Sequence, residues 1–273
     1  MTAALSRSLA LTADELHVIA SRVGIGDLPT VLNLGLRYPT IETRDAALDE
    51  AIRSLLSRNM IIDGVVDPEV IPVLQTLQRP DREFAMRFVT PEGTARISVV
   101  RRGSMCVLAR RVGDDIGLRI VGHGVDVRAV ASAILGELPR AKAAEVVPVG
   151  APLQEMSDKL SGTHSPVALA DRIRAVGADP QAAMLLGTAL GSRQAFAEIV
   201  YYALADDEGK ISRGPAAVAV FYTKRGRIIA APSVSPTGQL WTTLKAGTDH
   251  AFSQAIDQLA ELCDHRWGTY SGI

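Results

Sequence analysis

Two stretches of the chain share one layout, in which two runs of strand-forming residues are separated by a basic pair and a glycine. The first is "ISVVRRGSMCVL" at residues 97–108, and the second is "VAVFYTKRGRII" at residues 218–229. Branched and aromatic residues favour strands, and a glycine between two such runs supplies the positive φ of a tight hairpin. The sequence therefore predicts two antiparallel hairpins, with Gly103 and Gly226 in their turns.

Each hairpin belongs to a longer series of predicted strands that leads into a helix. In the first series the strands cover residues 82–90, 94–102, 104–112 and 117–122. In the second series they cover residues 216–223, 227–234 and 239–247. The helices that follow are capped by Asp126 in the first series and by Thr248 or Asp249 in the second, because such side chains accept hydrogen bonds from free N–H groups.

The spacing of these features indicates an internal duplication. Gly103 and Gly226 are 123 positions apart (226 − 103), and so are Asp126 and Asp249 (249 − 126). Two landmarks of different kinds at one offset predict a repeated unit of strand, turn, strand, strand and helix.

Helical periodicity and capping residues predict further elements outside the two series. Thr12 and Glu15 have the spacing of a capping box, and Gly24 ends that helix. Further helices are predicted at residues 43–59, 68–78 and 165–177, and from Asp179 through Val200. The alternation of apolar and polar residues in "LPTVLNLGLRY", residues 28–38, predicts a strand.

The composition is that of an ordinary globular chain, and it argues against two classes of partner. The net charge is −1 and aromatic residues make up 4%, whereas nucleic-acid binding needs a basic surface and aromatic platforms. No apolar run approaches the ~20 residues of a membrane helix, and the N-terminus lacks the residue order of a signal peptide. Cys106 and Cys263 fit buried thiols in a reducing compartment. We therefore expect a cytoplasmic protein.

No group of residues has the spacing of a catalytic or metal site. None of the five histidines has a partner at helical metal-site spacing or lies near a cysteine at zinc-finger spacing. One alternative is a hydrolase built around His123 in "GHG". Another is a hydrolase that uses Ser161, His164 and Ser165 of "SGTHS". Turn residues explain both motifs more simply, so we expect no catalytic residue, cofactor or metal, and we favour the binding of another protein.

Over almost its full length the chain resembles the EspG family, the cytoplasmic chaperones of mycobacterial type VII (ESX) secretion. The resemblance rests on "LTADELHVIASRVGIGDLPTVL", on "REFAMRFVT" to "CVLARR", and on an "AEIVYYAL" helix followed by "VAVFYTKRGRI". It implies an α+β fold with a mostly antiparallel central sheet flanked by helical bundles. It also implies a single domain over 1–273 with two halves related by a pseudo-two-fold axis, 1–140 and 141–273.

The resemblance implies a function as well. EspG proteins bind a PPE protein, as a PE–PPE heterodimer, at the exposed apolar tip of its helical bundle, keep it soluble and deliver it to the secretion system. Covering such an apolar patch prevents aggregation. The third ESX system is the expected branch, and the protein is expected to be a monomer or weak homodimer. A regulatory or scaffold protein with another partner is the alternative.

In the family, the partner lies across the sheet and the C-terminal helical half, and a loop between the second and third strands takes part. That loop corresponds here to Thr90–Ala95. The resemblance therefore makes Glu92, Gly93 and Thr94 candidate partner contacts.

Two further groups of residues complete the predicted surface. The basic residues beside the hairpin turns are candidates for its rim, where charge influences partner choice more than affinity: Arg101, Arg102, Lys224 and Arg225. For these, a purely solvated turn is the simpler interpretation. Phe221 and Trp241 are apolar candidates, for which packing in the core is the competing role.

Overall fold

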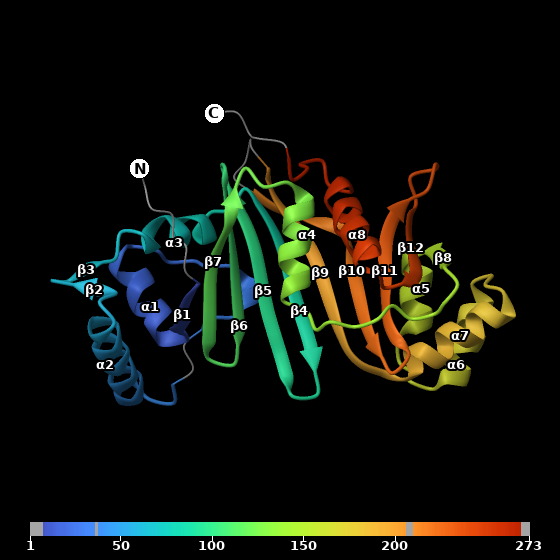
Figure 1. The fold of residues 1–273 in the computed structure, drawn as a ribbon, viewed down its shortest axis with the longest axis horizontal. Helices are drawn as coiled ribbons and strands as arrows, with labels where there is room; N and C mark the ends of the chain where they lie inside the picture. The colour runs from blue at the N-terminus through green and yellow to red at the C-terminus, as the bar shows by residue number, and fades with distance from the viewer. Residues whose placement is uncertain (1–7, 36–37, 206–209, 269–273) are drawn as a thin grey trace. The chain divides into compact units, whose positions relative to one another are not determined.

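The computed structural model describes residues 8–35, 38–205 and 210–268 (Figure 1). Within these residues the chain forms eight α-helices, one 3₁₀-helix and twelve strands. They belong to two compact units. Unit 1 contains the described residues through Ala85 together with Ala95–Val125, and unit 2 contains Met86–Thr94 and the described residues from Asp126 onward. In the same part of the chain, no helix is long and apolar enough to cross a membrane.

The predicted α+β fold class is confirmed, with ten strands in antiparallel pairing. The strand order is β1-β7-β6-β5-β4 through unit 1 and β4-β9-β10-β11-β12-β8 through unit 2. The four strands predicted in the first series are β4 (Arg82–Thr90), β5 (Gly93–Arg102), β6 (Met105–Val112) and β7 (Asp115–His123). The three predicted in the second are β10 (Lys210–Thr223), β11 (Gly226–Val234) and β12 (Leu240–Ala246). The sheet also contains β1 (Leu9–Thr12), β8 (Val149–Pro152) and β9 (Arg193–Ala205), which lie outside both series. Two short strands, β2 (Ile61–Ile62) and β3 (Val65–Val66), form a separate hairpin.

Unit 1 packs three helices against its strands. They are α1 (Ala13–Arg22), α2 (Ile41–Ser57) and α3 (Val70–Gln78). The capping box predicted at the start of α1 is present. Apolar side chains from all three helices meet those of β6 and β7 in one core, which includes Ile19, Leu55, Leu74, Val107 and Leu118. Burial of these side chains holds the helices on the sheet.

The strand predicted at residues 28–38 is wrong. Thr30–Leu32 form a 3₁₀-helix, and Asn33 follows with a left-handed φ of 52°. A left-handed residue turns the chain, so the apolar residues on either side of it do not share one strand face. Residues 36–37 lie outside the described residues.

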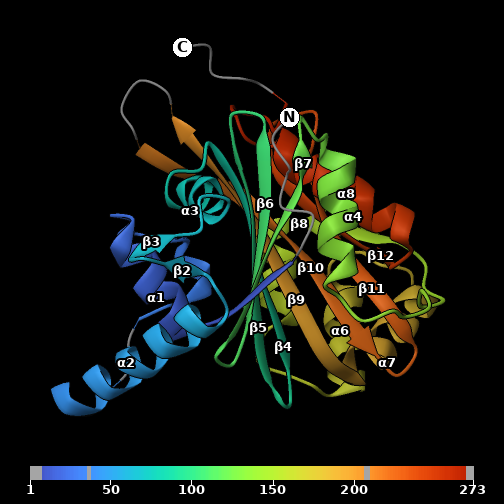
Figure 2. The ribbon, with the colours of Figure 1, turned by 60° about the vertical axis from the view of Figure 1, so that its left-hand side comes forward.

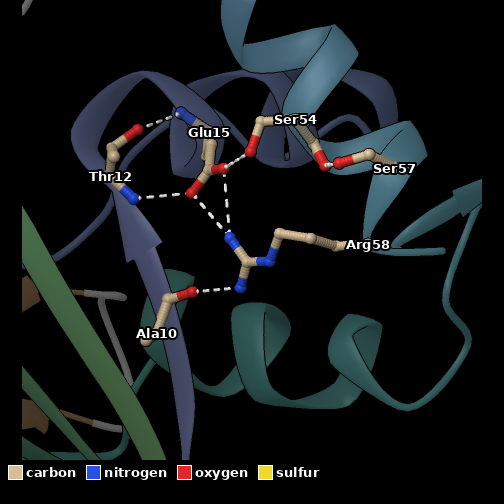
Figure 3. Close-up of polar contacts among 6 residues, drawn as sticks. All are labelled: Ala10, Thr12, Glu15, Ser54, Ser57 and Arg58. Carbon is tan, nitrogen blue, oxygen red and sulfur yellow. Dashed lines mark hydrogen bonds and ion pairs between the residues drawn. The ribbon is translucent and has the colours of Figure 1, made fainter.

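A buried carboxylate joins the helices α1 and α2 to β1 (Figure 3). Glu15 is 3% exposed, and it accepts hydrogen bonds from the Ser54 hydroxyl at 2.6 Å and the Thr12 N–H at 2.8 Å. Arg58 Nη1 lies 3.1 Å from both carboxylate oxygens, and Arg58 also donates to the Ala10 carbonyl. Burial alone raises the pKa of Glu15, but the two hydrogen bonds and the charge of Arg58 together lower it.

Unit 2 has helices on both faces of its strands. They are α4 (Val127–Gly136), α5 (Leu153–Leu160), α6 (Pro166–Ala175), α7 (Pro180–Gly191) and α8 (Asp249–Glu261). α4 and α8 lie side by side on one face (Figures 1 and 2). On β10, Phe221 packs with the core under α5–α7, whereas the Tyr222 hydroxyl donates to the Pro139 carbonyl just after α4. Because successive strand residues point to opposite faces, α5–α7 cover the face opposite α4 and α8.

The helix predicted from Asp179 through Val200 is wrong in its second half. α7 ends at Gly191 and β9 begins at Arg193, so the "AEIVYYAL" segment is a strand. Alternate residues of β9 are completely buried: Ala197, Ile199 and Tyr201. This two-residue period and the pairing with β10 decide the conformation, although the apolar residues also fit a helical spacing.

The repeated order of strand, turn, strand, strand and helix is present in β5–β6–β7–α4 and in β10–β11–β12–α8. Gly103 is the first residue of its turn, with φ of 54°, whereas Gly226 follows its turn and starts β11, with φ of 119°. Asp126 caps α4, but Thr248 rather than Asp249 caps α8. The spacing of 123 residues therefore does not join equivalent positions, although the order of elements recurs.

Candidate partner-binding surface

Two hairpin tips of unit 2 have the same internal hydrogen bonds, although their sequences share only a threonine and a glycine. They are "TPEG" at residues 90–93, between β4 and β5, and "TKRG" at residues 223–226, between β10 and β11. In each tip the threonine hydroxyl donates to the glycine carbonyl, at 3.3 and 2.7 Å, and accepts from the N–H of the third residue, at 3.2 and 3.1 Å. Figure 1 shows the arrowheads of β4 and β10 at the same edge of unit 2. Both tips therefore lie on one edge.

Four of the predicted site residues belong to these two tips, and a fifth, Thr94, follows the first tip in β5. Glu92, Gly93, Lys224 and Arg225 are exposed, and Thr94 is half-buried. The Lys224 N–H donates to the Ser192 carbonyl at 3.3 Å, which ties the basic tip to the end of α7. The hydrogen bond from the Thr90 side chain lowers the pKa of Glu92. One edge of unit 2 thus presents an acidic tip and a basic tip.

Phe221 stands opposite Phe196 in the pairing of β10 with β9, and both rings are half-buried. The guanidinium of the exposed Arg193 lies 5.5 Å from the centre of the Phe196 ring and 5.8 Å from that of Phe221. A cation over an aromatic face is held by the negative potential of the ring. Arg193 Nη2 also lies 3.5 Å from His164 Nδ1. Two aromatic rings and a cation thus form a small surface next to the basic tip.

We call Arg193, Phe196, Phe221, Lys224 and Arg225 the aromatic–basic patch. Further along the same face of β9, Glu198 pairs with Arg87 of β4 at 2.6 Å. Both side chains are partly exposed, at 33% and 56%. Arg193 and Phe196 were not predicted as surface residues because the sequence predicted a helix for this segment, which is strand β9. The alternation of "AFAEIVYYALA" was the signal that could have placed them on a strand.

The remaining predicted residues lie outside the patch. Arg101 is 3% exposed, so its expected place on a surface rim is wrong. Arg102, next to it in β5, is exposed and donates from Nη1 to the Gln75 carbonyl at 3.0 Å. Both belong to unit 1. Trp241 is half-buried in β12, and its ring packs beside Gly150.

In the two motifs that could have formed a hydrolase, the serines Ser161 and Ser165 have local structural roles. Ser165 caps α6 by accepting from the Ala168 N–H at 3.4 Å, and the Ser161 hydroxyl donates to the Asp158 carbonyl at 2.9 Å. His123 is exposed at the end of β7. Among the described residues, no three His, Cys, Asp or Glu side chains lie close enough to hold a metal ion.

Comparison with known proteins places the chain in a family. The EspG family pattern matches residues 12–258. The chain is 27% identical over 256 residues to the ESX-1 secretion-associated protein EspG1 of Mycobacterium tuberculosis, covering 92% of this chain and 86% of that protein. It is 28% identical over 276 residues to the ESX-3 secretion-associated protein EspG3 of Mycolicibacterium smegmatis, covering 94% and 88%.

A solved structure has the same fold. It is the M. tuberculosis type VII secretion system chaperone EspG5 in complex with a PE25–PPE41 dimer, with a TM-score of 0.81 and 17% identity over 97% of this chain and 100% of that one. The family match spans most of the sequence, and the fold agrees with it. The chain belongs to the EspG family.

Proposed function

We propose that this protein is a cytoplasmic, non-enzymatic chaperone that binds the PPE protein of a PE–PPE heterodimer and delivers it, in soluble form, to a type VII secretion system. The relative solved with PE25–PPE41 supports the class of partner. The ESX-3 branch stays a prediction, because the related proteins include members of both ESX-1 and ESX-3 at similar identity. We keep the single domain with halves at 1–140 and 141–273, and the monomer or weak homodimer, as parts of this proposal.

The aromatic–basic patch is the observation that carries the proposal. Two half-buried phenylalanine rings offer apolar area, Arg193 lies over both rings, and the exposed Lys224 and Arg225 add positive charge in the adjacent tip. Protein interfaces combine an apolar centre with a polar rim, and aromatic and arginine side chains supply much of their affinity. An apolar helical end with acidic neighbours fits such a surface.

The tip at residues 90–93 extends the proposed surface along the same edge of unit 2. Glu92, Gly93 and Thr94 could contact basic or polar groups of the partner. Arg102 is kept as a separate candidate contact in unit 1.

Co-expression with a panel of PE–PPE pairs tests the function. We expect at least one pair to co-purify as a complex with one copy of each of the three chains, measured by light scattering after gel filtration. Binding to no pair, together with capture of an unrelated partner, would favour the regulatory or scaffold alternative.

The variant Arg225→Glu tests the patch itself. We expect it to weaken binding of the PE–PPE pair by about tenfold, mostly through slower association at low salt, because rim charges act on the encounter. The melting temperature should stay the same, since an exposed charge contributes little to stability. Arg128→Glu on α4, on the opposite face of unit 2, makes the same change of charge and should leave binding intact. If both variants bind the PE–PPE pair with equal affinity, Arg225 does not belong to the partner-binding surface.

A further inference from the structure

The face of unit 2 that carries α4 and α8 contains a cavity of about 660 Å³. Its walls are the second half of α4, the segment that follows α4, one residue of β11 and the first residue of α8. The residues that form them include Ser132, Leu135, Gly136, Leu138, Pro139, Arg140, Ala141, Lys142, Arg227 and Asp249. This face is opposite the aromatic–basic patch.

The segment that closes the cavity is fixed by hydrogen bonds to β10 and β11. Tyr222 Oη donates to the Pro139 carbonyl at 3.0 Å, and the Arg227 N–H donates to the Lys142 carbonyl at 2.8 Å. A side chain at Gly226 would lie 2.7–2.8 Å from backbone atoms of this segment, so only glycine allows its close approach. The cavity is therefore preformed.

Positive charge predominates around the cavity. Arg227 is 2% exposed; its Nε donates to the Gly247 carbonyl at 2.6 Å and its Nη2 pairs with Asp249. Arg140 and Lys142 are exposed at the rim. Three cations thus face one carboxylate, and the Asp249 side chain is 75% exposed. A buried cation next to a partly enclosed space acts on a ligand more strongly than a solvated one, because water screens it less.

Apart from Ser132, the other lining residues are apolar, and the volume is that of a small-molecule site. Leu135, Leu138, Pro139 and Ala141 contribute aliphatic surface beside the charged groups. Ligand sites of about 300–1,000 Å³ typically combine apolar walls with a few placed polar groups. We propose that this cavity binds a small organic anion, with its phosphate or carboxylate at Arg140, Lys142 and Arg227 and a compact apolar body against α4 and Pro139.

Titration of the full chain with matched probes tests the ligand class. Phenyl phosphate and benzoate carry the same ring with different anions, benzyl alcohol carries the ring without charge, and inorganic phosphate carries charge without the ring. We expect phenyl phosphate or benzoate to shift the backbone amide NMR signals of residues 135–138, 140–142 and Arg227. Either anion should bind at least tenfold more tightly than benzyl alcohol or inorganic phosphate. The anion that binds more tightly, phenyl phosphate or benzoate, shows whether the cavity prefers a phosphate or a carboxylate. Equal binding of benzyl alcohol, or shifts spread over the whole surface, would overturn the proposal.

Two variants test the location without removing the buried Arg227. Gly136 ends α4, and a Cβ there meets no atom within 4 Å; Gly136→Leu should place a side chain in part of the cavity and weaken binding while the protein stays folded. Arg140→Glu should weaken binding of the anion about tenfold, whereas Arg128→Glu, which makes the same change of charge on α4 outside the lining, should not. Unchanged binding to Gly136→Leu would place the ligand elsewhere and contradict the inference.

Discussion

Gly187→Ala is expected to lower the free energy of unfolding of unit 2 by about 3 kcal/mol, the upper part of the usual cost of overpacking. A Cβ at Gly187 would lie 2.5 Å from the Ala170 nitrogen, 2.7 Å from the Pro166 carbonyl oxygen and 2.8 Å from the Ala170 Cα. All three are backbone atoms of α6, so no side-chain rotation relieves the clash and the two helices must separate. Trp241 and Trp267, the two tryptophans of the chain, both lie in unit 2, so the fluorescence change in urea measures this unit.

Gly136→Ala is the matched control for this substitution. It also replaces a helical glycine of unit 2, but its Cβ meets nothing within 4 Å. Alanine favours a helix over glycine by up to about 1 kcal/mol, so the control should be neutral or stabilising. If both variants unfold at the same urea concentration, the close approach of α6 and α7 does not hold in solution.

Gly187→Ala should also disturb the proposed partner surface. α7 ends beside the start of β9, where Arg193 lies over the two rings, and the Ser192 carbonyl accepts from Lys224. A shift of α7 therefore displaces both the cation and the basic tip. Partner binding should fall together with stability in Gly187→Ala, and binding by Gly136→Ala should be unaffected.

The elements that sequence reasoning placed correctly are those whose signals are local. The capping box of Thr12 and Glu15 and the N-cap Asp126 need only their neighbours in the chain, and the meanders follow from alternation and turn residues. The second half of the predicted long helix failed because residues 196, 199 and 200 fit both a helix and a strand. The pairing of β9 with β10, which decides between them, joins distant parts of the sequence.

The candidate site residues also divide into those that local signals place correctly and those whose position depends on strand pairing. Glu92, Lys224 and Arg225 were placed on exposed tips because turn chemistry is local. Arg101 and Arg102 are neighbours on one strand and point to opposite faces, so only one of them could lie on a given surface. Which one is buried depends on the register of β5 with β6, where Arg101 stands opposite the buried Cys106. Composition and spacing do not contain that information.

Arg58→Ala is expected to lower the free energy of unfolding of unit 1 by about 2 kcal/mol at pH 7, because it leaves the buried carboxylate of Glu15 without its cation. The figure lies below the usual cost of breaking a buried pair, since the Arg58 side chain is 39% exposed. Arg53→Ala is the control. Arg53 also pairs with a glutamate, Glu50, but the two side chains are 66% and 71% exposed, so its loss should not change unfolding. Far-UV circular dichroism follows both units, whereas tryptophan fluorescence follows unit 2 alone. Arg58→Ala should therefore shift the circular dichroism transition to lower urea and leave the fluorescence transition unchanged.

The loss caused by Arg58→Ala should depend on pH. The pKa of Glu15 is lowered in the folded protein, so the ionised carboxylate stabilises the fold above the glutamate's ordinary pKa of about 4.3, and this contribution disappears as the pH falls through the lowered value. Without Arg58, burial is opposed by fewer groups, so the pKa of Glu15 should rise and the variant should take up this proton at a higher pH than the wild type. A protonated Glu15 does not require a cation. The difference in unfolding free energy between wild type and variant should therefore narrow as the pH falls from 7 to 3, and a difference that stays constant would show that Arg58 acts through packing and its bond to Ala10 alone.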